Sequence, residues 1–337
     1  MRVLITGYGG FAGGHLADEL ATNTDWQLWG TVFSAETEGV GDGATGARPG
    51  VVVVPVDLRD PRSTRALIES VAPQLVFHLA GQAFVPAAWA DPWGTFETNV
   101  RMQINLLEAM ARRAPEGRPA RVVVISSNEV YGTVPPDQLP IDERRPLAPA
   151  NPYATSKAAQ DLVAVQYGCS HGMDVVRVRP FNHIGPRQND RFALPAFARQ
   201  IAEIEAGARP ARLDVGNLDA ERDFTDVRDV VRGYRLAAAL GRAGDVYNLG
   251  SGKPRSIRSL VETLLNLSRV AVEIAPDPAR ARPSEIPRTW CDASKARHEL
   301  GWRAEIPFEQ TVADVLDEWR AKVGVGAPMA AGAPPGG

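Results

Sequence analysis

A tyrosine and a lysine, Tyr153 and Lys157, stand four residues apart, a spacing that places both side chains on one face of a helix. A free tyrosine has a pKa of about 10, and a nearby ammonium is expected to lower it toward the working pH. Tyr153 could then exchange a proton with a substrate. Ser127 ends an apolar, strand-like run upstream and would orient the substrate oxygen. These three residue types predict acid-base chemistry at a carbon that gains or loses hydride.

A glycine-rich turn near the start could hold the hydride carrier. The segment Thr6–Gly13 follows a short apolar run and opens a helical pattern, where backbone N–H groups and the helix dipole can bind a pyrophosphate. Two glycine frames fit the turn: Gly7, Gly9 and Ala12 in one, and Gly7, Gly10 and Gly13 in the other. We favour the second frame because of the residues downstream. Lys157 would then also hydrogen-bond the nicotinamide ribose of the bound cofactor.

The choice between NAD and NADP stays open. An acidic residue about 20 positions after the turn would hold a ribose 2′-hydroxyl, and a basic residue would favour a 2′-phosphate. The second apolar run ends at Phe33-Ser34, which offers neither. Glu36 and Glu38 follow, and solvated loop charges are the simpler interpretation of both.

The elements that must position these residues alternate between two patterns. Short β-branched runs are separated by helix-length segments, around Thr95–Ala111 and Tyr153–Tyr167 among others. Near-continuous apolar strands are typical of a parallel sheet covered by helices on both faces. The sequence therefore predicts an α/β fold with a doubly wound parallel sheet of the Rossmann type. The strand runs are Val3–Ile5, Leu28–Phe33, Val51–Val56, Leu75–Leu79, Val122–Ile125, Val175–Val178 and Asp245–Leu249.

The alternation of strand and helix patterns becomes less regular after Arg179. This change predicts a second, smaller substrate domain that is interleaved with the first. We expect a dinucleotide-binding domain over residues 1–179, with returns near 225–250 and 286–300, and a mainly nucleotide-sugar-binding domain over 180–323. A helix is expected over Leu194–Glu205 and another over Thr225–Leu240. The Ala/Pro/Gly-rich end, residues 324–337, is predicted to be disordered.

Composition limits the partners. The 337 residues carry 37 Lys plus Arg against 40 Asp plus Glu, a net charge of −3, so we expect no nucleic-acid and no membrane partner. No apolar run approaches the roughly 20 residues of a membrane helix. Two distant cysteines, Cys169 and Cys291, and the lack of a His cluster argue against a disulfide framework and a metal site. The first residues do not resemble a signal peptide, and we expect a cytoplasmic protein.

Further motifs make the chain resemble a known superfamily. Val56-Asp57-Leu58 follows the third strand, His78-Leu79-Ala80-Gly81 the fourth, and Asn99 lies in the next helix. With the glycine turn and the YxxxK pair, they are similar to the extended short-chain dehydrogenase/reductase superfamily, in its nucleotide-sugar branch, up to about Lys322. The resemblance implies that Asp57 and Leu58 flank the adenine. It implies a cofactor set of Gly7, Gly10, Phe11, Gly13, Asp57, Leu58, Leu79, Ala80, Gly81, Tyr153, Lys157 and Pro180.

The second half narrows the resemblance. Residues 179–186 read RPFNHIGP, residues 215–218 read VGNL, and residues 222–229 read RDFTDVRD. These segments resemble enzymes that reduce GDP-4-keto-6-deoxy-mannose to GDP-D-rhamnose, and the related GDP-mannose 4,6-dehydratases carry similar ones. A GDP-sugar brings two phosphate charges, which guanidinium groups bind as forks. The resemblance implies a substrate set of Asn182, Val215, Asn217, Arg222, Arg282 and Glu285.

Glu129 bears on the type of reaction and completes the catalytic set with Ser127, Tyr153 and Lys157. Similar dehydratases use a glutamate near this position to remove a proton at C5. Ser127-Asn128-Glu129 departs from their triplet at Asn128, which cannot act as an acid. Some reductases also carry a carboxylate here. We favour an NAD(P)H-dependent reductase, with a 4,6-dehydratase and a 4-epimerase as alternatives and a non-catalytic nucleotide-sugar sensor as a remote one.

The resemblance also implies a homodimer. In the family, the helices around Thr95–Ala111 and Tyr153–Tyr167 pair into a four-helix bundle. Val100, Ile104 and Leu107 suit such an interface, and they equally suit burial within one subunit.

Overall fold

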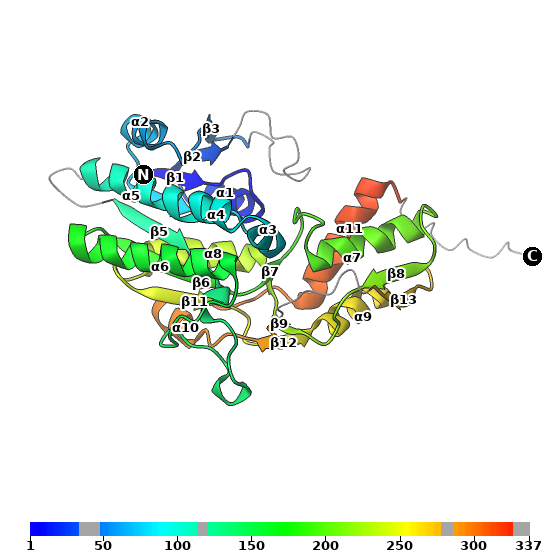
Figure 1. The fold of residues 1–337 in the computed structure, drawn as a ribbon. Coiled ribbons are helices and arrows are strands. Elements are labelled where there is room, and N and C mark those ends of the chain that lie inside the picture. The colour runs from blue at the N-terminus through cyan, green and yellow to red at the C-terminus, as the bar shows by residue number, and fades with distance from the viewer. Residues whose placement is uncertain (34–47, 114–119, 278–285, 326–337) are drawn as a thin grey trace, which may run out of the picture.

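The structure is a computed structural model that describes residues 1–33, 48–113, 120–277 and 286–325. Its main element is a seven-stranded sheet in the order β11-β6-β5-β4-β1-β2-β3, with every neighbouring pair parallel (Figure 1). The strand order reverses between β1 and β4, where open parallel sheets bind ligands. The predicted doubly wound parallel sheet is confirmed. The strands are β1 (Arg2–Thr6), β2 (Gln27–Val32), β3 (Val51–Pro55), β4 (Leu75–His78), β5 (Arg121–Ile125), β6 (Val175–Pro180) and β11 (Val246–Leu249).

Alternating side chains divide the core of this sheet into two layers. In β1, Val3 and Ile5 face one layer and Leu4 faces the other, and β5 repeats the pattern. Helices α1 (Phe11–Asn23), α8 (Val227–Leu240) and α10 (Ser294–Leu300) contribute to the first layer. Helices α2 (Pro61–Val71), α5 (Met102–Arg113) and α6 (Pro152–His171) contribute to the second.

A smaller unit lies beside the sheet (Figure 1). Strands β8 (Arg212–Val215) and β13 (Glu273–Pro276) pair in parallel, and helices α7 (Ala193–Glu205), α9 (Ile257–Leu267) and α11 (Phe308–Val323) share a hydrophobic core with them. Two small sheets connect the parts. One consists of β12 (Pro254–Ser256), β9 (Glu221–Asp223) and β14 (Arg288–Thr289), and the other of β10 (Thr225–Asp226) and β7 (His183–Ile184).

The chain passes between the two parts several times. It leaves the large sheet after β6 and returns to it with α8 and β11, and α10 later packs against that same region. The division at residues 179 and 180 into two domains stays a prediction. Most of the predicted tail lies outside the described residues.

Two predicted helices differ in detail. The helix expected over Thr225–Leu240 begins at Val227, because the Asp226 carboxylate caps it by accepting the Arg228 backbone N–H at 2.8 Å. The helix around Thr95–Ala111 is divided into α4 (Pro92–Phe96), a π-helical turn η1 (Glu97–Arg101) and α5. The short elements α3 (Val85–Ala90), η2 (Asn128–Tyr131) and η3 (Pro136–Gln138) complete the described chain.

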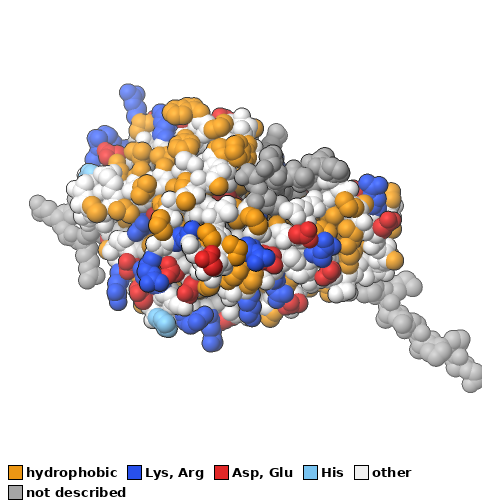
Figure 2. All heavy atoms as spheres, turned by 60° about the horizontal axis from the view of Figure 1, so that its bottom comes forward, with side chains coloured by type: hydrophobic (Ala, Val, Ile, Leu, Met, Phe, Trp, Pro, Cys, Tyr) orange, Lys and Arg blue, Asp and Glu red, His pale blue; other side chains and the backbone are white. Residues whose placement is uncertain are grey.

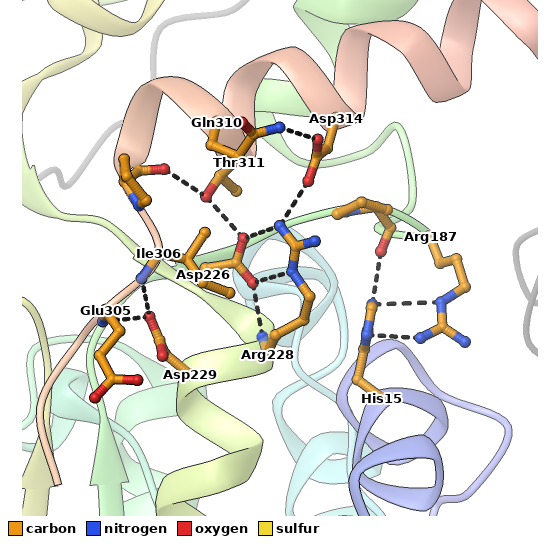
Figure 3. Close-up of polar contacts among 12 residues, drawn as sticks. His15, Arg187, Asp226, Arg228, Asp229, Glu305, Ile306, Gln310, Thr311 and Asp314 are labelled. Carbon is orange, nitrogen blue, oxygen red and sulfur yellow. Dashed lines mark hydrogen bonds and ion pairs between the residues drawn. The ribbon is translucent and has the colours of Figure 1, made fainter. Parts of the chain in front are cut away.

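A polar junction at the start of α8 holds α11 in place (Figure 3). The Asp226 carboxylate, which is fully buried, accepts hydrogen bonds from the Arg228 guanidinium at 2.7 and 2.9 Å and from Thr311 Oγ1 at 2.7 Å. Asp229 accepts the backbone N–H groups of Glu305 and Ile306, each at 2.8 Å. These buried carboxylates therefore tie the start of the last helix to the sheet.

Replacing Asp226 with alanine is expected to lower the free energy of unfolding by about 2–4 kcal/mol, because it removes a helix cap and the buried acceptor of Thr311 and Arg228, although Arg228 keeps its ion pair with Asp314. Urea unfolding of both proteins measures the effect. Asp219→Ala is the matched control, since Asp219 is 83% exposed in its pair with Arg258, and it is expected to cost less than about 1 kcal/mol. Equal losses in the two variants would contradict a stabilising junction.

The surface agrees with the near-neutral composition. On the face shown in Figure 2, Lys and Arg side chains are interspersed with Asp and Glu over the described residues. Among the helices that the structure describes, none is long and apolar enough to cross a membrane. In the same described ranges, His, Cys, Asp and Glu side chains form no group of three that could hold a metal ion.

Candidate active site

Glycines shape the turn between β1 and α1. Gly7 has φ of +71°, and a Cβ built there would lie 2.7 Å from the Ala80 nitrogen. A Cβ on Gly13 would overlap the Gly7 oxygen, to which Gly10 donates its N–H at 3.0 Å. The first N–H groups of a helix have no intrahelical acceptor. The start of α1 therefore presents hydrogen-bond donors next to glycines, which have no side chain to keep a ligand away. The turn fits a dinucleotide pyrophosphate, in the frame of Gly7, Gly10 and Gly13.

The end of β4 lies against this turn. Leu79 donates its N–H to the Thr6 carbonyl, and Ala80 donates its N–H to Thr6 Oγ1, both at 3.2 Å. A Cβ on Gly81 would lie 3.6 Å from Lys157 Nζ. The predicted cofactor residues of β1, β4 and α6 therefore share one place at the carboxyl edge of the sheet.

Asn99 joins the β4 loop to α6. Its Oδ1 accepts the Gln82 N–H at 2.7 Å, and its Nδ2 donates to the Gln82 carbonyl at 3.1 Å and to Ser156 Oγ at 2.9 Å. Asn99 lies in the π-helical turn η1, a geometry that is frequent at functional sites. The contact holds the loop that carries Gly81 against the helix that carries Tyr153.

Ser127, Glu129 and Tyr153 lie together at the start of α6. The Tyr153 hydroxyl lies close enough to the Ser127 hydroxyl for Ser127 to lower its pKa. Asn151 caps the helix by accepting the Ala154 N–H at 2.8 Å, and its Nδ2 donates to Glu129 Oε2 at 2.7 Å. The Ser127 hydroxyl accepts the Glu129 N–H at 3.2 Å. A single helix cap thus links both predicted acid-base residues, whose catalytic roles stay predictions.

The ionisation of Tyr153 differs from the sequence-based expectation. Burial raises the pKa of the phenol well above its usual value, against the effect of the Ser127 hydrogen bond, and the Glu129 charge raises the pKa further. The expected lowering by Lys157 is wrong for this arrangement, because Lys157 Nζ donates instead to the Ile125 carbonyl at 3.0 Å. Tyr153 therefore keeps its proton at neutral pH, which suits a proton donor.

Lys157 is a desolvated ammonium. Burial lowers its pKa to about 8. Burial, and then the Lys157 charge, lower the pKa of the neighbouring His78 to about 3, so His78 is neutral. His78 Nδ1 lies 2.8 Å from Thr6 Oγ1, which ties the end of β4 to that of β1. Lys157 thus places a positive charge beneath the β4 loop.

The other predicted cofactor residues lie along the same edge. Asp57 and Leu58 follow β3, Leu58 is buried, and Asp57 forms an ion pair with Arg59 at 2.9 Å. Pro180 ends β6 and pairs with Leu249 of β11. Phe11 is the first residue of α1.

The predicted substrate residues are spread over several elements. Asn182 follows β6, and its buried Oδ1 has no hydrogen-bond partner among the described residues, which suits a ligand contact. Arg222 lies in β9, where its guanidinium donates to the Glu221 carbonyl at 2.9 Å. Asn217 is exposed after β8.

Val215 does not fit the predicted set as a side chain. It ends β8 and is buried in the hydrophobic core of the smaller unit, because strand alternation directs it inward. Arg282 and Glu285 lie outside the described residues.

Two aromatic contacts were not predicted. The rings of Phe11 and His183 are stacked with centroids 5.8 Å apart and an interplanar angle of 3°. The rings of Phe84, at the start of α3, and Phe192, at the start of α7, meet edge-on at 5.9 Å. Both join residues distant in sequence, and no local pattern in the chain indicates such pairs. They bring segments after β6 against the turn and the β4 loop.

The family model described as GDP-mannose 4,6 dehydratase matches residues 4–315. This chain belongs to that family. A GDP-6-deoxy-D-mannose reductase of Pseudomonas aeruginosa is 38% identical over 96% of this chain and 98% of its own length. The resemblance to the nucleotide-sugar branch is confirmed.

Solved structures of relatives have the same fold. RMD from Pseudomonas aeruginosa, complexed with NADPH, matches with a TM-score of 0.80 and 36% identity over 96% of this chain and all of that one. DesIV, a dTDP-glucose 4,6-dehydratase from Streptomyces venezuelae with NAD and TYD bound, matches with a TM-score of 0.81 and 27% identity, covering 96% and 98% of the two chains. This GDP-mannose 4,6 dehydratase family member thus aligns with relatives over nearly its whole length.

Proposed function

We propose that this protein reduces the 4-keto group of GDP-4-keto-6-deoxy-D-mannose with NADPH and forms GDP-D-rhamnose. The observation that carries the proposal is the placement of Ser127 close to Tyr153, with Lys157 beside the β4 loop at the glycine turn, in a chain that a GDP-6-deoxy-D-mannose reductase matches over nearly its whole length. A protonated phenol is the state that ketone reduction requires. The NADPH-bound relative supports the choice of cofactor.

The residues of the chain divide the work. Bound NADPH supplies the hydride that reduces C4. Tyr153 donates its proton to the carbonyl oxygen, which becomes the C4 hydroxyl, and the Ser127 hydroxyl holds that oxygen by a hydrogen bond. Lys157, whose ammonium lies beside Gly81 of the β4 loop, is placed to hydrogen-bond the ribose of the bound nicotinamide nucleotide. The glycine turn and the start of α1 hold the cofactor diphosphate, while Asn182 and Arg222 contribute to holding the GDP-sugar.

The direct test supplies purified protein with GDP-4-keto-6-deoxy-D-mannose and NADPH. We expect consumption of one NADPH for each GDP-D-rhamnose formed, measured by NADPH absorbance and by chromatography of the nucleotide sugar. GDP-mannose without added reductant is expected to remain unchanged. Turnover of GDP-mannose with no net use of NADPH would instead identify a dehydratase or an epimerase.

The position of Glu129 favours a 4,6-dehydratase as the second candidate, because its carboxylate is close enough to act on Tyr153. Glu129→Gln separates the two reactions, since the amide oxygen can still accept the Asn151 hydrogen bond. In a reductase we expect the rate to fall by less than about tenfold, because no C5 proton is removed. A dehydratase would lose roughly 10²–10⁴-fold with its general base. Initial rates with GDP-mannose and with GDP-4-keto-6-deoxy-D-mannose distinguish the two reactions.

We also propose a homodimer through α5 and α6. Leu162 on α6 and Ile104 on α5 are exposed, and such apolar side chains suit an interface. Leu107, which the sequence also suggested, is buried within the subunit core. Light scattering during gel filtration measures the mass in solution.

A further inference from the structure

The end of β2 provides no acid for a cofactor ribose. In dinucleotide-binding sheets an acidic residue here holds the 2′-hydroxyl of NAD, and an arginine nearby accommodates the 2′-phosphate of NADP. In this chain β2 ends at Val32 and is followed by Phe33, whose side chain is 65% exposed. The residue type that would select NAD is therefore replaced by an apolar one.

A guanidinium stands over that exposed ring. Arg59 Cζ lies 4.9 Å from the Phe33 ring centroid. Strands β2 and β3 are adjacent, with Val32 opposite Pro55, so the loop that carries Arg59 borders the adenosine end of the sheet. The geometry is that of a cation over an aromatic face, which fixes the plane of the guanidinium.

A second contact orients the same group. Asp57 accepts hydrogen bonds from Arg59 Nε at 3.0 and 3.2 Å and from Nη2 at 2.9 Å. Asn105 Nδ2 donates to the carbonyls of Leu58 and Arg59, each at 2.9 Å, which anchors the loop backbone to α5. Among the described residues, Nη1 makes no hydrogen bond. Asp57 thus holds the Nε–Nη2 edge of the guanidinium and the Phe33 ring lies against its face, which leaves Nη1 available to a ligand.

The neighbouring charges are already paired. Asp57, Arg59, Asp60, Glu97 and Arg101 line a surface hollow at this end of the sheet. Asp60 caps α2 by accepting the Arg62 and Ser63 N–H groups at 3.2 and 3.1 Å. Glu97 and Arg101 form an ion pair at 3.0 Å. Arg59 is therefore the cation of this hollow that combines a fixed orientation with an open edge.

We propose that Arg59 recognises the 2′-phosphate of NADPH through its Nη1 edge and so determines the preference for NADPH over NADH. Phe33 and Asp57 act as positioning residues for the guanidinium. Arginine suits this task because its donors form a planar fork that matches phosphate oxygens. The inference deepens the proposed function and rests on it for the identity of the cofactor.

Binding of two fragments tests the proposal without turnover. Titration calorimetry with 2′,5′-ADP and with 5′-AMP isolates the contribution of the 2′-phosphate. We expect Arg59→Ala to weaken 2′,5′-ADP binding by about 10–100-fold, the range for hydrogen bonds to a charged group, and to leave 5′-AMP binding unchanged. Arg101→Ala, which alters the same hollow, is the matched control and is expected to bind both fragments like the wild type. Arg59 is a surface residue, so its loss leaves the core intact.

Kinetics provide the second measurement. The ratio of kcat/KM for NADPH to that for NADH is expected to fall by the same factor in Arg59→Ala and to recover in part in Arg59→Lys, which keeps the charge without the fork. Equal losses for both cofactors, or no loss for 2′,5′-ADP, would overturn the proposal. If the wild type prefers 2′,5′-ADP yet reduces no 4-keto sugar, the proposed function fails while the role of Arg59 stands.

Discussion

Replacing Tyr153 with phenylalanine is expected to lower kcat for ketone reduction by about 10²–10⁴-fold, the contribution of a positioned general acid. The ring still fills the same buried space, so binding of GDP and NADPH is expected to remain near the wild-type value. The structure gives the reason for the large effect, because burial raises the pKa of this phenol and keeps it protonated, close to Ser127. Stopped-flow rates and equilibrium titrations separate the two quantities.

A second tyrosine serves as the matched control for this variant. Tyr234 is fully buried in the same protein, and its hydroxyl has no hydrogen-bond partner among the described residues. Tyr234→Phe removes the same atom and is expected to leave kcat unchanged. If both variants kept the wild-type rate, the assignment of Tyr153 as proton donor would be wrong.

Lys157→Met is expected to lower kcat/KM for NADPH by roughly 10–100-fold, because it removes the buried ammonium beside Gly81 that would hydrogen-bond the ribose of the cofactor. Methionine fills the space with an unbranched apolar side chain, which spares the packing. The variant loses the hydrogen bond to the Ile125 carbonyl, which lowers the stability only locally. A cooperative thermal unfolding transition should therefore show that the variant is folded. A rate within threefold of the wild type would contradict the assignment.

The pH dependence of the wild type provides an independent check on Lys157. Burial lowers the Lys157 pKa to about 8, so the positive charge is present below that pH and is lost above it. We expect kcat/KM for NADPH, which reports the protein without bound cofactor, to fall on the alkaline side with an inflection near this value. Lys157→Arg stays charged, and its residual activity should lack that alkaline fall. Tyr153 adds no such limb, because its pKa is raised beyond the neutral range.

Local patterns were sufficient to predict the sheet and the closeness of Ser127 and Tyr153. Apolar runs such as Val122–Ile125 are nearly continuous because the parallel strands are covered on both faces, and this property is visible in the sequence alone. Helical spacing placed Tyr153 and Lys157 on one helix, and the order of strands placed Ser127 close to Tyr153. These relations depend on neighbours in sequence or on a regular topology.

The remaining features depend on contacts between distant segments. The direction of the Tyr153 pKa shift follows from burial and from the orientation of Lys157, and the YxxxK spacing predicts neither of them. The Arg59–Phe33 contact needs the registration of two strands, and Asp226 needs Thr311 from the last helix. The substrate contact predicted for Val215 stays a prediction, and because the strand buries its side chain, only its backbone is left to make that contact.

The pairing of β11 with β6 has a consequence for biosynthesis. Residues 175–180 form β6 and acquire their outer neighbour only from residues 246–249, which follow the first excursion into the smaller unit. A nascent chain that does not yet contain residues 246–249 would expose the unpaired edge of β6 to other polypeptides. Folding that proceeds from the N-terminus during synthesis therefore cannot complete the sheet until β11 has been made. A chaperone that covers the open edge of β6 until then would limit aggregation.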